Sequence, residues 1–172
     1  MIAGRVEALA LMLAAMVAGS AFANGLVASD FPQADLVLVE KGKRKLHLLK
    51  DGEPFRTFDI ALGLAPDGDK EQEGDQKTPE GRYILDERNP DSDYFLSIHI
   101  SYPSARDRNE ARQKGVDPGG AIMIHGQPNV PTFSQAYYRR EDWTNGCIAV
   151  SNSDMIDIWL MTPDDTPIEI VP

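Results

Sequence analysis

The single cysteine of the chain, Cys147, stands in a segment whose residue types suit a thiol nucleophile. It follows Asn145-Gly146, a pair that favours a tight turn because both residues tolerate positive φ. The apolar residues 148–150 that follow it predict a short buried segment. Such a turn gives the thiol access and surrounds it with backbone N–H groups that can stabilise a developing negative charge. We therefore expect Cys147 to be catalytic, with Gly146 and Asn145 forming the turn and the oxyanion site.

A histidine at the end of an apolar run is the candidate base. Residues 121–124 are apolar and His125-Gly126 follows them, a pattern typical of a strand that delivers a base to the rim of a site. A thiol nucleophile and its base are usually far apart in sequence. The alternative for a lone cysteine is a small buried hydrophobic residue. His47 is expected to be a half-exposed strand residue without a catalytic role.

These segments resemble the signature of the L,D-transpeptidase (YkuD-type) catalytic domain. That family's pattern is a histidine followed by Ser/Thr-x-Gly-Cys, which Thr144 to Cys147 matches after His125. The segment Thr78-Pro79-Glu80-Gly81 matches the family's upstream Thr-Pro-x-Gly. The resemblance spans residues 35–172. It implies one mainly β domain with short helices, a β-sandwich or barrel, that uses Cys147 and His125 as nucleophile and base without a cofactor.

Two departures from the family pattern bear on the substrate. Most members carry a second histidine where this chain has Asn145, and an arginine where it has Ala149. The run Gly-Cys-Ile-Ala-Val resembles a smaller branch that includes enzymes that cut peptidoglycan linkages. The resemblance implies a stem peptide of peptidoglycan as acyl donor, cut at the carbonyl of its third residue. It leaves open transfer to an amine or hydrolysis, and a non-catalytic wall-binding module is the alternative of another class.

The residues around the cysteine suggest how a substrate is bound. Arg139 and Arg140 lie a few residues before the nucleophile in an acidic protein, so they are candidates for binding a substrate carboxylate in place of the missing arginine. Further candidates for substrate contacts are Trp143, Thr144 and Gly126. On the strand expected at 94–101, Ser97, His99 and Ser101 share one face, which could face the site or solvent equally well.

Length and composition limit the remaining possibilities. The chain has 172 residues and a net charge of −10, which fits one domain and argues against nucleic-acid binding. Residues 1–23 resemble a cleaved signal peptide, with an uncleaved anchor as the alternative, and residues 24–34 a flexible lead-in. We therefore expect a periplasmic monomer without stable membrane insertion. Residues 63–77, rich in Asp and Glu, predict a solvated, mobile loop rather than a calcium site, and three scattered histidines make a metal centre unexpected.

Alternating apolar residues and turn signals predict the elements that must position these residues. A final helix over 151–160 is expected to direct Ile156 and Trp159 to the core. The expected strands are 35–40, 44–49, 55–62, 82–87, 94–101, 121–125 and 166–171, and a further helix is expected at 105–114.

Overall fold

The computed structural model describes residues 31–172. The expected signal peptide and residues 24–30 of the lead-in lie outside this part. In chain order the elements are β1 (Leu36–Glu40), β2 (Lys45–Lys50), β3 (Glu53–Asp59), β4 (Gly81–Asn89), β5 (Ser97–Ile100), α1 (Ala105–Lys114), β6 (Met123–His125), α2 (Gln135–Arg140), β7 (Ile148–Ala149), α3 (Asn152–Met161) and β8 (Thr166–Val171).

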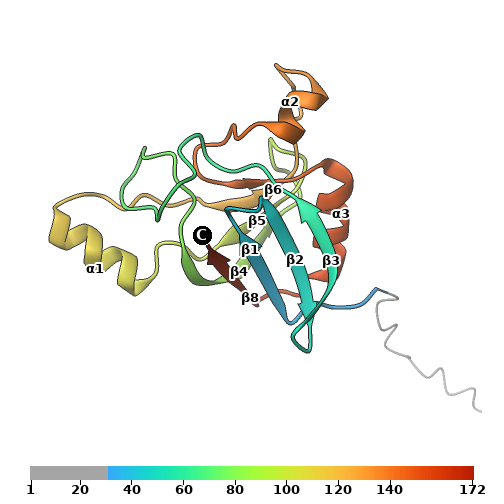
Figure 1. The fold of residues 1–172 in the computed structure, drawn as a ribbon, viewed down its shortest axis with the longest axis horizontal. Helices are drawn as coiled ribbons and strands as arrows, with labels where there is room; N and C mark the ends of the chain where they lie inside the picture. Colours follow the sequence, from blue (N-terminus) through green and yellow to red (C-terminus); the bar gives the residue numbers. More distant parts are fainter. Residues whose placement is uncertain (1–30) are drawn as a thin grey trace, which may run out of the picture. The chain divides into compact units, whose positions relative to one another are not determined.

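The eight strands of residues 31–172 belong to one sheet, in the order β3-β2-β1-β8-β4-β5-β6-β7 (Figure 1). The pairs β1–β8 and β6–β7 are parallel, and the remaining neighbours are antiparallel. Beyond β3, Ala61 forms an antiparallel bridge to Ala149 of β7, and Gly63 pairs with Thr144. The sheet therefore curls until its two ends meet beside the cysteine turn. The expectation of a mainly β domain with short helices is confirmed.

The core lies inside the curled sheet and beneath α3. Alternation places Val37 and Val39 of β1 inward, both fully buried. From α3 the buried residues are Met155, Ile158 and Met161. The prediction that Ile156 faces the core is wrong, because the phase of the helix leaves that side chain 43% exposed. Trp159 packs against the core while partly buried, as expected.

Local signals set the ends of the helices and of β5. α1 begins at a capping box formed by Ser104 and Asp107 and ends at Gly115 in the left-handed conformation. β5 starts at Ser97 rather than at residue 94, because Phe95 adopts a φ of 70° that interrupts an extended chain. Figure 1 shows α1 and α3 on opposite sides of the strands. No helix within residues 31–172 is both long enough and apolar enough to cross a membrane.

Candidate active site

Strands β6 and β7 bring His125 and Cys147 to one face of the sheet. Their parallel register pairs Ile124 with Ile148, and both side chains are fully buried in the core. Because side chains alternate along a strand, the flanking residues His125 and Cys147 share the opposite face. Both line a cavity of ≈ 290 Å³. The predicted nucleophile and base therefore meet in one site, although 21 residues separate them in sequence.

The imidazole of His125 is held in one tautomer. Its Nδ1 lies 2.7 Å from the carbonyl oxygen of Gly126, which can only accept, so Nδ1 carries the proton and Nε2 can receive one. The side chain is buried beside the rings of Tyr94 and Trp143, with centroids 4.6 and 5.6 Å away. Burial lowers the pKa of His125 to about 4, although the Gly126 hydrogen bond opposes the shift. His125 is thus a neutral base at physiological pH.

Gly126 is required at its position by close packing. A Cβ atom there would lie 2.7 Å from Oδ1 of Asn152, 3.0 Å from Cβ of Phe95 and 3.1 Å from the carbonyl oxygen of Tyr94. Its N–H donates to Leu96. Gly126 therefore orients the imidazole of His125 through its carbonyl, a role that the sequence-based prediction of a substrate contact did not include.

The turn before Cys147 is braced by Thr144. The Thr144 hydroxyl donates to the carbonyl of Cys147 at 2.8 Å and accepts the N–H of Gly146 at 3.1 Å. Gly146 adopts the predicted positive φ, 126°, and a Cβ atom on it would lie 2.6 Å from the carbonyl oxygen of Lys77. Since the Gly146 N–H is engaged, the N–H of Cys147 is the better candidate for an oxyanion donor.

The thiol of Cys147 is half-buried and protonated in the resting site. It donates to the carbonyl of Ala121 at 3.6 Å, a residue whose own φ is 54°. Burial raises the pKa of the Cys147 thiol, against opposing effects of a backbone hydrogen bond with Met123 and the charge of Lys70. A neutral thiol and a neutral imidazole that line one cavity require the base to remove the proton when a substrate is attacked.

Cys147 lies between two cavities of different character. A second cavity of ≈ 400 Å³ shares Ala121, Asn145 and Cys147 with the first. Lys70 and Glu73 also line the second cavity, whereas the described lining of the first contains neither Asp, Glu, Lys nor Arg. A chain bound across the nucleophile would therefore pass from an uncharged aromatic cavity into a charged one.

The acidic loop of residues 63–77, behind the cysteine turn, is solvated in part, as predicted, because Asp67, Glu71 and Glu73 are exposed. An internal ion pair nevertheless holds Lys70 and Asp75 inside the loop, and its mobility stays a prediction. Lys70 is buried, and its ammonium donates to Asp75 at 2.7 Å and to the Gln72 carbonyl at 3.0 Å. Although burial alone raises the pKa of Asp75, backbone N–H donors including those of Gln72 and Glu71, together with Lys70, hold it below its usual range. The sequence does not reveal the pairing of Lys70 with Asp75, because that pairing depends on the folded path of the loop.

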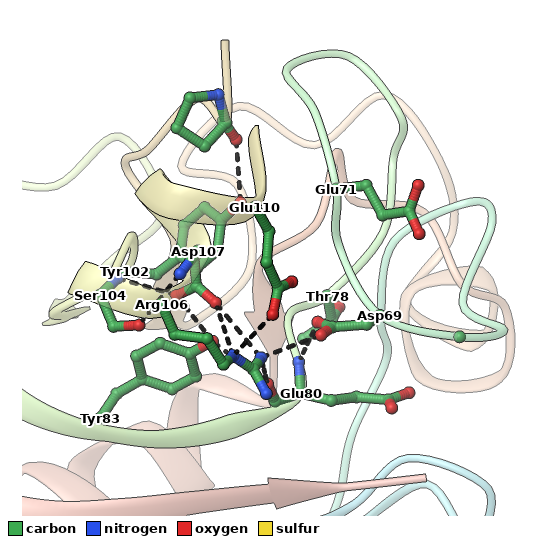
Figure 2. Close-up of polar contacts among 12 residues, drawn as sticks. Asp69, Glu71, Thr78, Glu80, Tyr83, Tyr102, Ser104, Arg106, Asp107 and Glu110 are labelled. Atoms are coloured by element: carbon green, nitrogen blue, oxygen red, sulfur yellow. Dashed lines mark hydrogen bonds and ion pairs between the residues drawn. The ribbon is translucent and has the colours of Figure 1, made fainter. Parts of the chain in front are cut away.

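The same loop is tied to helix α1 by a polar network, drawn in Figure 2. The Arg106 guanidinium donates to Asp69 at 3.0 Å and to the carbonyl of Glu80 at 2.8 Å, and forms an ion pair with Asp107 at 3.2 Å. Asp69 and Asp75 of this loop thus have separate cationic partners. Within residues 31–172 no group of three His, Cys, Asp or Glu side chains is arranged to hold a metal ion.

The remaining predicted site residues differ in their placement. Trp143 and Thr144 line the first cavity. Arg139 lines a separate cavity of ≈ 320 Å³ beside the start of α3, and Arg140 is exposed; neither lines the two cavities that border Cys147. Their substrate role stays a prediction without support from this placement.

The other two histidines are engaged elsewhere. His47 binds Glu40 and Thr57, and His99 lies 2.6 Å from Asp86. The carboxylate of Asp142, close to Cys147 in sequence, accepts from Arg44.

Ser97 is a site residue whose role the sequence left open. It pairs across the strands with His125, is 1% exposed and lines the first cavity. Its hydroxyl has no hydrogen-bond partner in the described part of the chain. The two residues of the expected polar face of β5 therefore have different surroundings. Ser97 borders the cavity, whereas His99 contacts Asp86.

Comparison with known proteins agrees with this geometry. The family model for the L,D-transpeptidase catalytic domain (YkuD) matches residues 34–170. The chain belongs to this family. Relatives of the L,D-transpeptidase domain include YafK of Escherichia coli (strain K12), which is 36% identical over 100 residues, covering 52% of this chain and 37% of YafK.

Solved structures place the same fold in longer proteins. The helical cell shape determining protein Pgp2 of Campylobacter jejuni matches with a TM-score of 0.61 and 29% identity, over 78% of this chain and 46% of Pgp2. Bd1075 of Bdellovibrio bacteriovorus matches with a TM-score of 0.55 and 27% identity, over 82% of this chain and 48% of Bd1075. This chain thus spans less than half the length of these L,D-transpeptidase-fold relatives.

Proposed function

We propose that this protein is an exported cysteine acyltransferase that acts on the stem peptides of peptidoglycan. The observation that carries the proposal is that Cys147 and His125 line the same cavity. Nδ1 of the histidine donates to the Gly126 carbonyl, which leaves Nε2 to take a proton. Membership of the L,D-transpeptidase family supports the reaction class.

The first half-reaction forms a thioester. Nε2 of His125 takes the proton of the thiol as Sγ of Cys147 attacks the carbonyl carbon of the third stem residue. The C–N bond to the following residue breaks, and the imidazolium gives its proton to the leaving amine. The Cys147 N–H would stabilise the oxyanion, and loss of one such donor typically costs roughly 3 kcal/mol of transition-state stabilisation.

The second half-reaction releases the acyl group. An amine of another stem peptide attacks the thioester, the C–S bond breaks, and the proton of the attacking amine passes through His125 to the thiolate. Water in place of the amine gives hydrolysis of the same bond. Ala149 supports the hydrolytic alternative. Most relatives carry an arginine at this position, whereas here it is a buried strand residue that forms backbone hydrogen bonds with Ala61.

The cellular location and role that we propose rest on the sequence and on the relatives. Residues 1–23 have the features of a signal peptide, so we propose that the enzyme works in the periplasm, as a monomer and without a cofactor. The similarity to Pgp2, a protein named for determining helical cell shape, makes an effect on cell shape part of the proposal.

Purified muropeptides provide the direct test. Wild-type protein should release the terminal residue of a tetrapeptide stem, and mass spectrometry should identify either a cross-linked product or a tripeptide stem. Cys147→Ala and Cys147→Ser should abolish both products while leaving the circular dichroism spectrum and the melting temperature of the protein near those of the wild type. Near-normal turnover by the serine variant would refute the thiol mechanism.

Labelling with a carbapenem separates the enzyme from a wall-binding module. An activated thiol opens the β-lactam and gains its mass, whereas a module without turnover has no reason to react. His125→Ala should slow this acylation by about 10²–10⁴-fold, the usual range for loss of a general base. The matched controls, His47→Ala and His99→Ala, should react at the wild-type rate. Binding to peptidoglycan without any labelling would favour the module.

A further inference from the structure

One peptide group connects the catalytic histidine to α3. The carbonyl of Gly126 accepts Nδ1–H of His125 at 2.7 Å. The N–H of Gln127, on the other side of the same planar peptide unit, donates to Oδ1 of Asn152 at 2.7 Å. The peptide unit is therefore held at both ends, by the imidazole and by the asparagine amide.

This arrangement has an electrostatic and a geometric consequence. Hydrogen bonds in series polarise each other. The hydrogen bond that the Gln127 N–H donates to Asn152 therefore makes the Gly126 carbonyl a better acceptor for Nδ1–H of His125. The same bond fixes the plane of the peptide, and with it the direction in which the carbonyl points. Oδ1 also occupies the space where a Cβ atom on Gly126 would lie, so the amide packs directly against the unit that it orients.

The side chain of Asn152 is not explained by helix capping. Ser151 is the N-cap of α3, and its hydroxyl accepts the N–H of Asp154 at 3.1 Å. Asn152 instead reaches Gln127, 25 residues earlier. The first turn of α3 is rigidly placed, because Met155 and Ile158 are fully buried in the core.

We propose that Asn152 is a positioning residue for acyl transfer, which acts on His125 through the Gly126–Gln127 peptide group. The proposal rests on the proposed function, because it assigns Asn152 to the same cysteine–histidine site. Asn152 touches neither the thiol nor the substrate. It keeps Nδ1 protonated and Nε2 directed to the cavity.

Two substitutions at this position separate positioning from general stability. Asn152→Ala removes the acceptor, and should lower kcat on a stem tetrapeptide by about 10- to 100-fold, as expected for a misplaced catalytic group, with KM changed less than about 2-fold. Asn152→Asp keeps an oxygen acceptor at a helix N-terminus that favours negative charge, and should restore kcat to within about 3-fold of wild type. Ser153→Ala, the adjacent control on α3, should leave kcat and KM unchanged.

A second measurement needs no turnover. Nitrogen-15 NMR of the ring of His125 at neutral pH should show a single Nδ1–H tautomer in the wild type and in Asn152→Asp, and a mixture of tautomers in Asn152→Ala. An unchanged kcat in Asn152→Ala, or an aspartate variant as defective as the alanine variant, would overturn the proposal. A wild-type protein that does not process stem peptides would instead refute the proposed function, and the NMR comparison would still decide the role of Asn152.

Discussion

The proposed catalytic pair, Cys147 and His125, consists of two groups that burial keeps neutral. Burial lowers the pKa of His125 and raises that of Cys147, so proton transfer between them is unfavourable until a substrate carbonyl receives the developing charge. In this state the thiol stays protonated until a reactive carbonyl, of a substrate or of a carbapenem, is bound in the site. If the protein is exported as proposed, such a site limits side reactions of its single free thiol.

Because His125 resists protonation in the folded state, its titration should appear in the stability of the protein. The histidine of the unfolded chain gains a proton near pH 6.5, whereas folded His125 does so at about pH 4. Between these values the unfolded state binds more protons, so stability should fall as pH falls, by roughly 3 kcal/mol in total. Below about pH 4 this contribution should level off.

Urea denaturation of the wild type and of His125→Asn between pH 4 and 7 measures this effect. The difference between the two free-energy curves isolates the histidine, because carboxylates titrate in both proteins. Parallel curves for the wild type and His125→Asn would contradict the assigned burial effect.

Two buried hydroxyl groups allow a second prediction about single residues. Ser97 and Thr78 are almost completely buried, and neither hydroxyl has a hydrogen-bond partner in the described residues. Ser97→Ala and Thr78→Val should therefore leave the free energy of unfolding unchanged or raise it by up to about 1 kcal/mol. If the substrate supplies the missing partner in the cavity, only Ser97→Ala will also lower kcat/KM. A stability loss above about 1 kcal/mol in either variant would show a hidden partner.

At the scale of elements, hydrogen bonds join the segment before Cys147 to the segments that follow β1 and β3. The carboxylate of Asp142 accepts from Arg44, after β1, and from the N–H of Leu62, after β3. The carbonyl of Leu62 in turn accepts the N–H groups of Trp143 and Thr144. These contacts place the cysteine turn relative to the sheet before any substrate binds.

Removing this carboxylate should affect both stability and catalysis. Asp142→Ala should lower the free energy of unfolding by about 1.5–3 kcal/mol, because charged hydrogen bonds are lost, and should reduce the rate of carbapenem acylation. Asp59→Ala removes an exposed ion pair with Lys45 and should cost at most about 1 kcal/mol, without a change in acylation. Chemical denaturation and mass-shift kinetics measure the two effects. Equal stability losses for both variants would argue against this assignment.

At the scale of the whole domain, the active site lies where the curled sheet closes. Gly63 lies at this seam, where a Cβ atom would approach the carbonyl oxygen of Gln76 to 2.0 Å and Cα of Gly146 to 3.0 Å. Backbone thus packs on backbone directly behind the nucleophile. The segment after β3 thus packs against both the acidic loop and the cysteine turn, and the three segments support one another.

Gly63→Ala should disturb all three parts of this support. The substitution is expected to cost about 1–3 kcal/mol of stability, as overpacking commonly does, and to slow acylation of Cys147 by displacing Gly146. Gly42→Ala is a matched control, because a Cβ atom there meets only Pro172 at 3.7 Å. Thermal melting and carbapenem labelling of the two variants provide the test. Wild-type acylation in a folded Gly63→Ala protein would show that the turn does not depend on this seam.

Sequence alone was sufficient for the features that depend on local chemistry. The turn at Gly146, the apolar run before His125, the capped helix α1 and the alternation of the strands are properties of neighbouring residues, and the structure contains each of them. The family pattern likewise resides in short segments. The pairing of His125 with Cys147 was predictable because both residues stand in such segments.

Tertiary structure alone decided which side chains surround the pair. Asn152 meets Gln127, Ser97 meets His125 and Lys70 approaches Cys147 only because strands and loops distant in sequence are hydrogen-bonded together. Arg139 and Arg140 are close to Cys147 in sequence but do not line its cavities. Helix α2 directs Arg139 to a different cavity. A side chain's direction depends on the phase of its element and on the partner of that element, and neither is a local property of the sequence.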